Sequence, residues 1–333
     1  MLEPVWTRTG DAPPELSVLM PVRNTAGMVG DAVSSVLGQR GCVAEILVSD
    51  DGSDDGTLDV VLGAVRADRG PHTVTVLRTT RRLGIDHVGT LARASAGPLL
   101  VQAHGDDVSL PGRLATLRDL HRRTGASLIT SSVRWEKAGA VVDEPVPAGY
   151  ADGWVPLNAL VAVNPGIFAG ARYAIGRAVF ERFPPLTSAY LPIGHDVVQP
   201  FRAALLGGAW FCTQRLLRCG CHDGQWTYRL WDRRFPAAAN FGFLLNRLGA
   251  MRAMAKDLDH AAATALLPDD RIAAARAVVD GAASAAFNEL LRYREELRRM
   301  GREPLWVTEE ELARANHGAK HDDSREAAGD TEG

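Results

Sequence analysis

The feature that most constrains the fold is an alternation of short apolar runs and amphipathic patterns that extends over residues 15–138. Apolar runs predict strands at residues 15–22, 44–50, 72–80, 97–103 and 126–135. Helical spacing of apolar residues between them predicts helices at residues 24–41, 57–70, 85–96 and 111–125. Short apolar strands that alternate with helices are typical of a mostly parallel sheet covered by helices on both faces. We therefore expect an α/β fold.

Local signals indicate where two of these helices begin and end. Asn24 or Thr25 is suited to cap the first helix, and Gly41 is suited to end it. Pro111 stands at the start of the fourth helix, where a proline is tolerated in the first turn.

The alternation weakens after about residue 138. The patterns there predict, in order, a helix at 155–163, a strand and then a helix from near Gly176, a helix within 191–208, strands and a turn within 209–224, and helices over 236–300. The last residues are polar and offer nothing apolar to bury, which is typical of disorder. This second part of the chain does not continue the regular strand–helix repeat.

These patterns divide the chain into four expected parts. We expect an N-terminal lead (1–14), an α/β domain (15–235), a helical extension (236–317) and a disordered tail (318–333). Within the α/β domain, residues 15–138 form the first half and residues 139–235 the second.

Composition narrows the classes of partner. The chain has 333 residues, 46% of them hydrophobic, and a net charge of −3, so it can bury a core and has no general attraction for nucleic acid. Its four cysteines match neither a zinc ribbon nor a disulfide framework. Neither a signal peptide nor an apolar stretch long enough for a membrane span is visible. We expect a cytoplasmic protein that does not bind nucleic acid.

The stretch LVSDDGSDDGT places two carboxylates directly after a predicted strand. It is compatible with a solvated turn in which Ser53 or Asp54 caps the next helix. Ligands of such sheets bind beyond the carboxyl ends of the strands, so an aspartate here is also suited to accept a hydrogen bond from a nucleobase. Both interpretations remain open on these residues alone.

Three further stretches carry candidate chemistry. The acidic pair in HGDD, residues 104–107, is suited to hold Mg²⁺ or Mn²⁺ or to cap the helix that follows. In GHDVVQPF, Asp196 is suited to act as a general base or as a helix cap. In CGCHDGQWTYR, His222 is suited to ligate a metal or to contact phosphate, although a lone histidine more often does neither.

The order of these blocks resembles the inverting glycosyltransferases of family 2, which have the GT-A fold with a Rossmann-like, mostly parallel sheet. The first block of the family, strand–P-V-Y-N–helix–Q, is similar to LMPVRN followed by VLGQ. The V-D-D-G-S-x-D-x-T block resembles residues 49–57, and D-A-D-D-x-x-x-P resembles residues 104–111. The late E-D block resembles His195–Asp196. The resemblance covers roughly residues 15–230.

The resemblance implies a role for each of the residues expected to bind the nucleotide-sugar donor. Pro21, Val22 and Asn24 match the segment that lines the nucleotide pocket. Asp51 matches the aspartate that contacts the nucleotide base, usually uracil. Asp106 matches the last carboxylate of the D-x-D motif, which coordinates Mg²⁺ or Mn²⁺.

The resemblance also implies a catalytic base and marks where this chain departs from the family pattern. Asp196 matches the base, and His222 matches a histidine near the diphosphate and metal. His104 replaces the first aspartate of D-x-D, so we name it and His222 as further candidate metal ligands. His195 replaces the glutamate of the E-D block. The A-R-N-x-G helix start and the Q-x-x-R-W signature of processive synthases are absent.

The implied reaction is transfer of a sugar, typically a hexose, from a nucleotide-diphospho-sugar to an acceptor hydroxyl with inversion. Asp51 favours a UDP- or dTDP-type donor. The acceptor is a glycan, a lipid-linked sugar or a small molecule, which indicates a role in polysaccharide or glycoconjugate biosynthesis.

Two other functions fit the same kind of sheet. A sugar nucleotidyltransferase requires a glycine-rich loop with Arg or Lys after the first strand, and PVRNTAGMVGDA lacks one. A non-catalytic nucleotide-sugar-binding module would explain His104 and His195, but Asp51, Asp106 and Asp196 are retained.

The stretch FGFLLNRLGAMRAMAKDL in the helical extension is amphipathic and basic. Such a helix lies on a membrane surface, packs on its own domain or pairs with a second copy of the chain. We therefore keep peripheral membrane contact and a homodimer through the C-terminal helices as alternatives.

Overall fold

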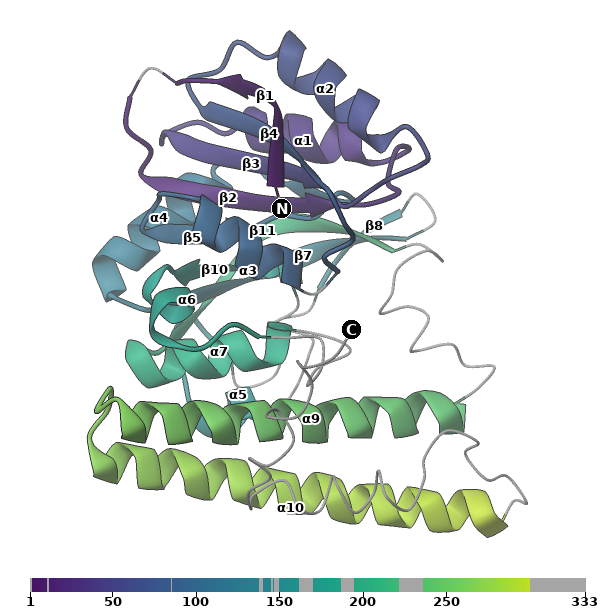
Figure 1. The fold of residues 1–333 in the computed structure, drawn as a ribbon, viewed down its shortest axis with the longest axis vertical. Coiled ribbons are helices and arrows are strands. Elements are labelled where there is room, and N and C mark those ends of the chain that lie inside the picture. Colours follow the sequence, from purple (N-terminus) through teal and green to yellow (C-terminus); the bar gives the residue numbers. More distant parts are fainter. Residues whose placement is uncertain are drawn as a thin grey trace, which may run out of the picture.

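The fold is built around one sheet of eleven strands (Figure 1). The computed structural model describes residues 2–10, 12–84, 86–137, 140–144, 146, 150–161, 170–186, 195–221 and 236–299. His222 and the expected tail at 318–333 lie outside the described residues.

The strands follow the order β1-β4-β3-β2-β5-β10-β7-β11-β6, and β8 and β9 pair with β7 and β11. In chain order they are β1 (Leu2–Arg8), β2 (Leu16–Val22), β3 (Ala44–Asp50), β4 (Thr73–Thr79), β5 (Leu99–Gln102), β6 (Asp107–Ser109), β7 (Leu128–Lys137), β8 (Ala140–Asp143), β9 (Gly153–Val155), β10 (Tyr173–Gly176) and β11 (Ala209–Cys221).

The helices of the described residues pack on both faces of this sheet and below it (Figure 1). They are α1 (Val29–Leu37), α2 (Thr57–Ala67), α3 (Asp86–Ala94), α4 (Arg113–Thr124), α5 (Leu157–Val161), α6 (Ala178–Arg182), α7 (His195–Leu206), α9 (Pro236–Ala263) and α10 (Asp269–Arg299), with a short 3₁₀ turn at Gly170–Arg172.

The first half of the chain forms the parallel part of the sheet, in the order β4-β3-β2-β5. Successive side chains of a strand point to opposite faces, so Val18 and Met20 pack under α1, α2 and α4, whereas Leu19 packs under α3. The expected α/β architecture with helices on both faces is confirmed. The carboxyl ends of β2, β3 and β5 lie at one edge and place the acidic turns there.

The second half of the sheet is mixed. Strand β10 pairs antiparallel with both β5 and β7, and β11 runs parallel to β7 and antiparallel to β6. Strands and a turn were expected within 209–224; β11 is one strand with two register shifts up to Cys221, and residues 222–224 lie outside the described residues. Strand β1, within the expected N-terminal lead, pairs antiparallel with β4 at the sheet edge.

The expected helix caps are wrong, because the polar side chains bond across loops instead. Helix α1 begins at Val29, after Asn24 in a left-handed conformation (φ 49°) whose side chain bonds Asp54. Helix α2 is preceded by Gly56 at φ 90°, and Ser53 bonds Asp50.

Two expected helix bounds are also corrected. Helix α1 ends at Leu37, with Gly38 as its C-cap, so Gly41 lies beyond it. Pro111 precedes α4, whose N-cap is Gly112 at φ 80°, because only a residue that tolerates positive φ fits that turn.

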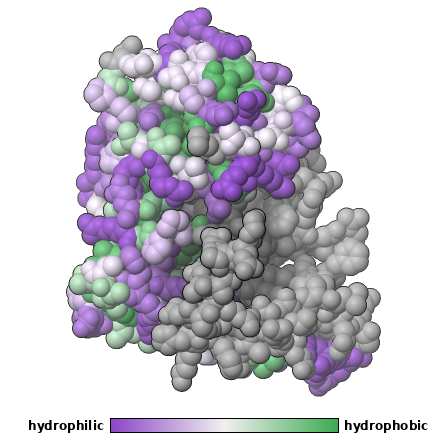
Figure 2. All heavy atoms as spheres, in the orientation of Figure 1, coloured by the Kyte–Doolittle hydropathy of each residue, from purple (hydrophilic) through white to green (hydrophobic). Residues whose placement is uncertain are grey.

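The predicted C-terminal helices form a hairpin of α9 and α10 (Figure 1). Their buried faces share one apolar core with Phe183, Phe201 and Leu205 of the preceding domain. None of the described helices combines the length and apolarity that a membrane crossing requires. Figure 2 shows hydrophilic side chains over much of the described surface of this face.

Candidate active site at the carboxyl edge of the sheet

Asp51 lies directly after β3 and is almost completely buried, with 5% of its surface exposed. Its Oδ1 accepts hydrogen bonds from the Thr79 hydroxyl (3.0 Å) and the Leu83 N–H (2.8 Å). Its Oδ2 accepts one from the Gly84 N–H at 2.9 Å. A carboxylate oxygen has two lone pairs, so Oδ2 retains one acceptor position.

The protonation state of Asp51 is set by these bonds. Burial alone raises the pKa of this carboxyl, but the N–H groups of Leu83 and Gly84 outweigh it and hold the pKa below the ordinary value of 3.8. Asp51 is therefore a fixed anion at neutral pH.

The end of β2 lies beside Asp51 and leads into the adjoining loop. The Asp51 N–H donates to the Val22 carbonyl at 3.0 Å. The side chain of Val22 is buried in the core, that of Pro21 is half-buried, and that of Asn24 is exposed. Asn24 donates to Asp54 at 2.9 Å, which ties the two loops that follow β2 and β3.

The HGDD turn after β5 brings three candidate ligands together. One atom each from His104, Asp106 and Asp107 lies within 4.8 Å of the others. His104 Nδ1 is 3.8 Å from Asp107 Oδ2, and the Gly220 N–H donates to Asp107 Oδ1 at 3.2 Å. The expected pair of Asp106 and His104 therefore meets, and Asp107 joins it. The expected fourth candidate, His222, lies outside the described residues.

The acidic group is shaped by the glycines around it. A Cβ added at Gly170 would overlap the imidazole of His104. A Cβ at Gly105 would come within 2.7 Å of the Thr25 hydroxyl, so the HGDD turn packs closely against the loop after β2. The absence of a side chain at Gly105 lets the loop after β2 approach the acidic group, and its absence at Gly170 leaves room for the imidazole of His104.

The pKa of Asp107 differs from that of an ordinary surface carboxylate. Burial, reinforced by the charge of Asp106, raises the pKa of Asp107 from 3.8 to about 6. The guanidinium of Arg113 lies nearby and is fully buried, and burial lowers its pKa from 12.5 to about 10. Two carboxyls that repel each other in a buried turn are stabilised by a cation.

Asp196 is the second residue of α7, so it lies inside the first turn and is not the N-cap of this helix, which was one of its two expected roles. The Tyr173 hydroxyl on β10 donates to Asp196 Oδ1 at 3.3 Å and accepts from Gln102 Nε2 at 2.8 Å. Burial, together with the Asp196 charge, raises the pKa of Tyr173 well above its ordinary value of 10.0, so the phenol keeps its proton.

This chain of contacts places Asp196 near the carboxyl end of β5, after which the HGDD turn follows. Gln102 stands two residues before His104, and through Tyr173 it reaches Asp196. Asp107 belonged to the acidic pair predicted from HGDD but was not named as a ligand by itself, and Gln102 and Tyr173 were not predicted as site residues from the sequence. For Asp107 the signal was its adjacency to Asp106, whereas Tyr173 lies in a buried strand and gave no local signal.

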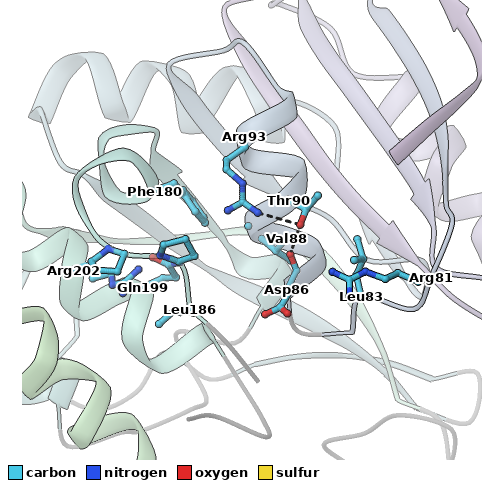
Figure 3. Close-up of a pocket in the computed structure, with 13 residues that line it drawn as sticks. Arg81, Leu83, Asp86, Val88, Thr90, Arg93, Phe180, Leu186, Gln199 and Arg202 are labelled. Carbon is cyan, nitrogen blue, oxygen red and sulfur yellow. Dashed lines mark hydrogen bonds between the residues drawn. The ribbon is translucent and has the colours of Figure 1, made fainter. Parts of the chain in front are cut away.

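A cavity of about 200 Å³ lies between α3, α6 and α7 (Figure 3). Side chains from α3, α6 and α7 surround it, together with the loop after β4 and the segment Pro184–Leu186. Its wall includes Gln199, which follows Asp196 by three residues on α7.

The family model described as "Glycosyl transferase family 2" matches residues 17–185. The chain belongs to this family. The matched region covers β2 to α6, which includes the acidic turns after β3 and β5. The resemblance drawn from the order of the sequence blocks is thereby confirmed.

Two curated relatives match a part of the chain. Over 108 residues it is 34% identical to the uncharacterized protein MT1568 of Mycobacterium tuberculosis (strain CDC 1551 / Oshkosh), which is 32% of each chain. Over 110 residues it is 34% identical to the succinoglycan biosynthesis protein ExoU of Rhizobium meliloti (strain 1021), which is 33% of this chain and 31% of that protein. The matches thus span about a third of the length of these relatives.

The fold has a counterpart among solved structures. S. aureus TarS residues 1–349, solved in complex with UDP-GlcNAc, superposes with a TM-score of 0.54 at 14% sequence identity. The superposition covers 92% of this chain and 88% of that chain. The GT-A fold implied by the family resemblance is confirmed.

Proposed function

We propose that this member of glycosyl transferase family 2 transfers a sugar from a nucleotide-diphospho-sugar to an acceptor hydroxyl with inversion at the anomeric carbon. The observation that carries the proposal is the joint placement of two acidic centres at one sheet edge. One is the group of His104, Asp106 and Asp107, and the other is Asp196. Family membership and the fold shared with TarS, which was solved in complex with UDP-GlcNAc, support the same donor class.

On the donor side, Asp51 is proposed to recognise the nucleotide base. Its remaining acceptor position on Oδ2 suits one N–H donor, and the N3–H of uracil or thymine is such a group. The segment of Pro21, Val22 and Asn24 lies beside it and is proposed to line the nucleotide pocket. A UDP- or dTDP-type donor follows from this chemistry.

The acidic group fits a divalent cation. Two carboxylates and one imidazole suit Mn²⁺, and the carboxylates also suit Mg²⁺. When bound, the cation would neutralise the negative charge of the departing diphosphate. His104, Asp106 and Asp107 would hold it, and His222 remains a predicted further ligand. The raised pKa of Asp107 indicates that this turn disfavours two negative charges without such a partner.

On the acceptor side, Asp196 is proposed as the general base. It takes the proton of the acceptor hydroxyl as the hydroxyl oxygen attacks the anomeric carbon and the diphosphate leaves from the opposite side. Tyr173, held by Gln102, orients the carboxylate through its hydroxyl. Attack without an enzyme nucleophile inverts the anomeric centre. The acceptor is proposed to be a glycan, a lipid-linked sugar or a small molecule of glycoconjugate biosynthesis.

The proposal is tested with a panel of UDP-, dTDP- and GDP-sugars in the presence of Mn²⁺ or Mg²⁺, with nucleoside diphosphate release as the readout. We expect slow hydrolysis of at least one UDP- or dTDP-sugar. We also expect Asp106→Ala to remove the metal-dependent part of donor affinity in calorimetry, since it removes a ligand of the cation.

Asp280→Ala, which removes an exposed carboxylate on α10, serves as the matched control and should bind the donor as the wild type does. If no nucleotide sugar binds or is hydrolysed, the chain is not a transferase of this donor class. Equal Mn²⁺-dependent affinity in Asp106→Ala and the wild type would contradict the metal assignment alone.

A further inference from the structure

The cavity beside Asp196 contains buried oxygen atoms that nothing in the described part of the chain satisfies. Gln199 is 3% exposed and lines the cavity, and its Oε1 has no hydrogen-bond partner among the described residues. Oδ1 of Asp86, on α3 across the cavity, is also buried without a partner. Buried polar atoms in folded proteins are nearly always paired, so two unpaired acceptors in one cavity wall indicate a missing donor.

The cavity also carries cations that are not neutralised within the described residues. Arg81 and Arg93 line it, and neither forms an ion pair among the described residues. Arg93 donates only to the Thr90 hydroxyl, at 3.3 Å (Figure 3). Arg202 differs, because its guanidinium donates to both oxygens of Asp257. Among the described residues, the guanidinium groups of this cavity without an acidic partner are therefore those of Arg81 and Arg93.

The wall also has an apolar part. It includes Val88, Phe180, Pro184, Pro185 and Leu186. Apolar surface combined with a few fixed polar groups is typical of a small-molecule site. A ligand that suits this cavity presents hydroxyl donors to Gln199 and Asp86, oxygen acceptors to the arginines, and an apolar face to Phe180.

The position of the cavity relates it to the proposed base. Residues three apart on a helix lie on neighbouring positions of one face, so Gln199 stands one turn along α7 from Asp196. Tyr173, which bonds Asp196, packs in the same apolar cluster as Val88 of the cavity wall. A ligand in contact with Gln199 would thus lie about one helical turn from the proposed base.

We propose that this cavity binds a sugar ring of the acceptor, with Gln199 and Asp86 accepting hydrogen bonds from its hydroxyl groups. The assignment to the acceptor rests on the proposed glycosyl transfer. A lipid tail offers no donors to the two unpaired oxygens, and a diphosphate offers only acceptors, so a polyhydroxylated ring fits the cavity better than either. Arg81 and Arg93 favour a ring that also carries a carboxylate.

The test uses the full chain and a panel of simple methyl glycosides as probes, namely those of glucose, mannose, galactose, N-acetylglucosamine and glucuronic acid. Binding is followed by saturation-transfer NMR and titration in the presence of UDP and Mn²⁺. We expect at least one glycoside to bind saturably. Gln199→Met, which keeps the side-chain volume and removes the unpaired oxygen, should weaken that binding at least tenfold.

The thermal midpoint of Gln199→Met gives a second readout, which distinguishes a role in ligand binding from a purely structural role. Removing an unsatisfied buried oxygen should leave the thermal midpoint of the ligand-free protein unchanged or raise it. Ser132→Ala is the matched control, because the Ser132 hydroxyl is also buried and unpaired but lies on β7 outside the cavity wall. It should keep glycoside binding. Arg93→Ala should weaken the glucuronide more than the neutral glycosides.

Three results would overturn the inference. The first is that none of the glycosides binds saturably, and the second is that Gln199→Met binds them as tightly as the wild type. The third is that Gln199→Met loses UDP affinity in parallel, which would assign the cavity to the donor. If glycosides bind in a Gln199-dependent way but no nucleotide sugar binds or is hydrolysed, the proposed transfer fails while the sugar site stands.

Discussion

At the scale of single residues, the carboxylate of Asp51 holds together the loop that precedes α3. Its three hydrogen bonds come from Thr79, Leu83 and Gly84, and all three donors lie at or beyond the end of β4. The residue proposed to recognise the nucleotide base is thus also the residue that fixes the loop beside it. Replacing it should therefore affect stability as well as binding.

We expect Asp51→Asn to lower the free energy of unfolding by about 2–3 kcal/mol near neutral pH, because an amide nitrogen would face backbone N–H groups. The folded-state pKa of Asp51 lies below the ordinary value of 3.8. The stabilisation is therefore present above that value and is lost as the pH falls through the folded-state pKa. Urea unfolding at several pH values should show the gap between wild type and variant narrowing only below about pH 4. A gap that stays constant would show that the charge of Asp51 contributes nothing.

The sequence predicted the candidate residues whose position follows from a strand end. Asp51, Asp106 and Asp196 were identifiable because each follows an apolar run or opens a helix at the expected edge. Tyr173 and Gln102 were not, because their contact joins strands β10 and β5, which are far apart in the chain and pair antiparallel. A contact of that kind depends on a pairing that no local pattern encodes.

At the scale of elements, α7 connects the proposed base to the C-terminal hairpin. Asp196 lies in its first turn, Gln199 faces the cavity, and Arg202 binds Asp257 of α9. The Arg202 guanidinium makes two hydrogen bonds of 2.7 Å to the carboxylate, and both residues are 3% exposed. Burial raises the pKa of Asp257 despite this partner. The free energy of unfolding should therefore fall when either Arg202 or Asp257 is lost alone.

We expect Arg202→Leu to lower the free energy of unfolding by about 3–5 kcal/mol, because it leaves a buried carboxylate without its counter-charge. The double variant Arg202→Leu, Asp257→Leu should recover most of that loss, since it removes both charges from the interior. Urea unfolding of the wild type and both variants measures the difference. A double variant as unstable as the single one would mean that packing, rather than charge, accounts for the effect.

Helices and strands were predictable where an apolar pattern determines their position. They were less predictable where contacts within loops determine where an element begins or ends. The strands β2 and β3 follow from apolar runs that are buried on both faces of the sheet, and β4 follows from a run in which buried residues alternate with half-buried or exposed ones over most of its length. The start of α1 was misplaced because Asn24 bonds Asp54 in the loop after β3 instead of capping the helix. Strand β1 was missed because most of it is exposed at the sheet edge and gives only a weak apolar pattern.

At the scale of the whole molecule, the chain combines a parallel first half of the sheet, a mixed second half and a helical hairpin. The order of the motif blocks was enough to predict the family and the GT-A fold. The mixed pairing of β10, β7, β11 and β6 was not predictable, because it depends on which distant strands meet. The amphipathic face of α9 packs against its own domain through Leu248, Met251 and Leu258.

The central claim is that Asp196 accepts the proton in sugar transfer while separate residues bind the donor. The most direct measurement compares turnover and nucleotide affinity of Asp196→Asn with those of the wild type, using the nucleotide sugar that the panel identifies. We predict that turnover falls by at least a hundredfold, as expected when a general base is removed, while the dissociation constant of the donor changes by less than about threefold. Near-wild-type turnover in Asp196→Asn would contradict this assignment.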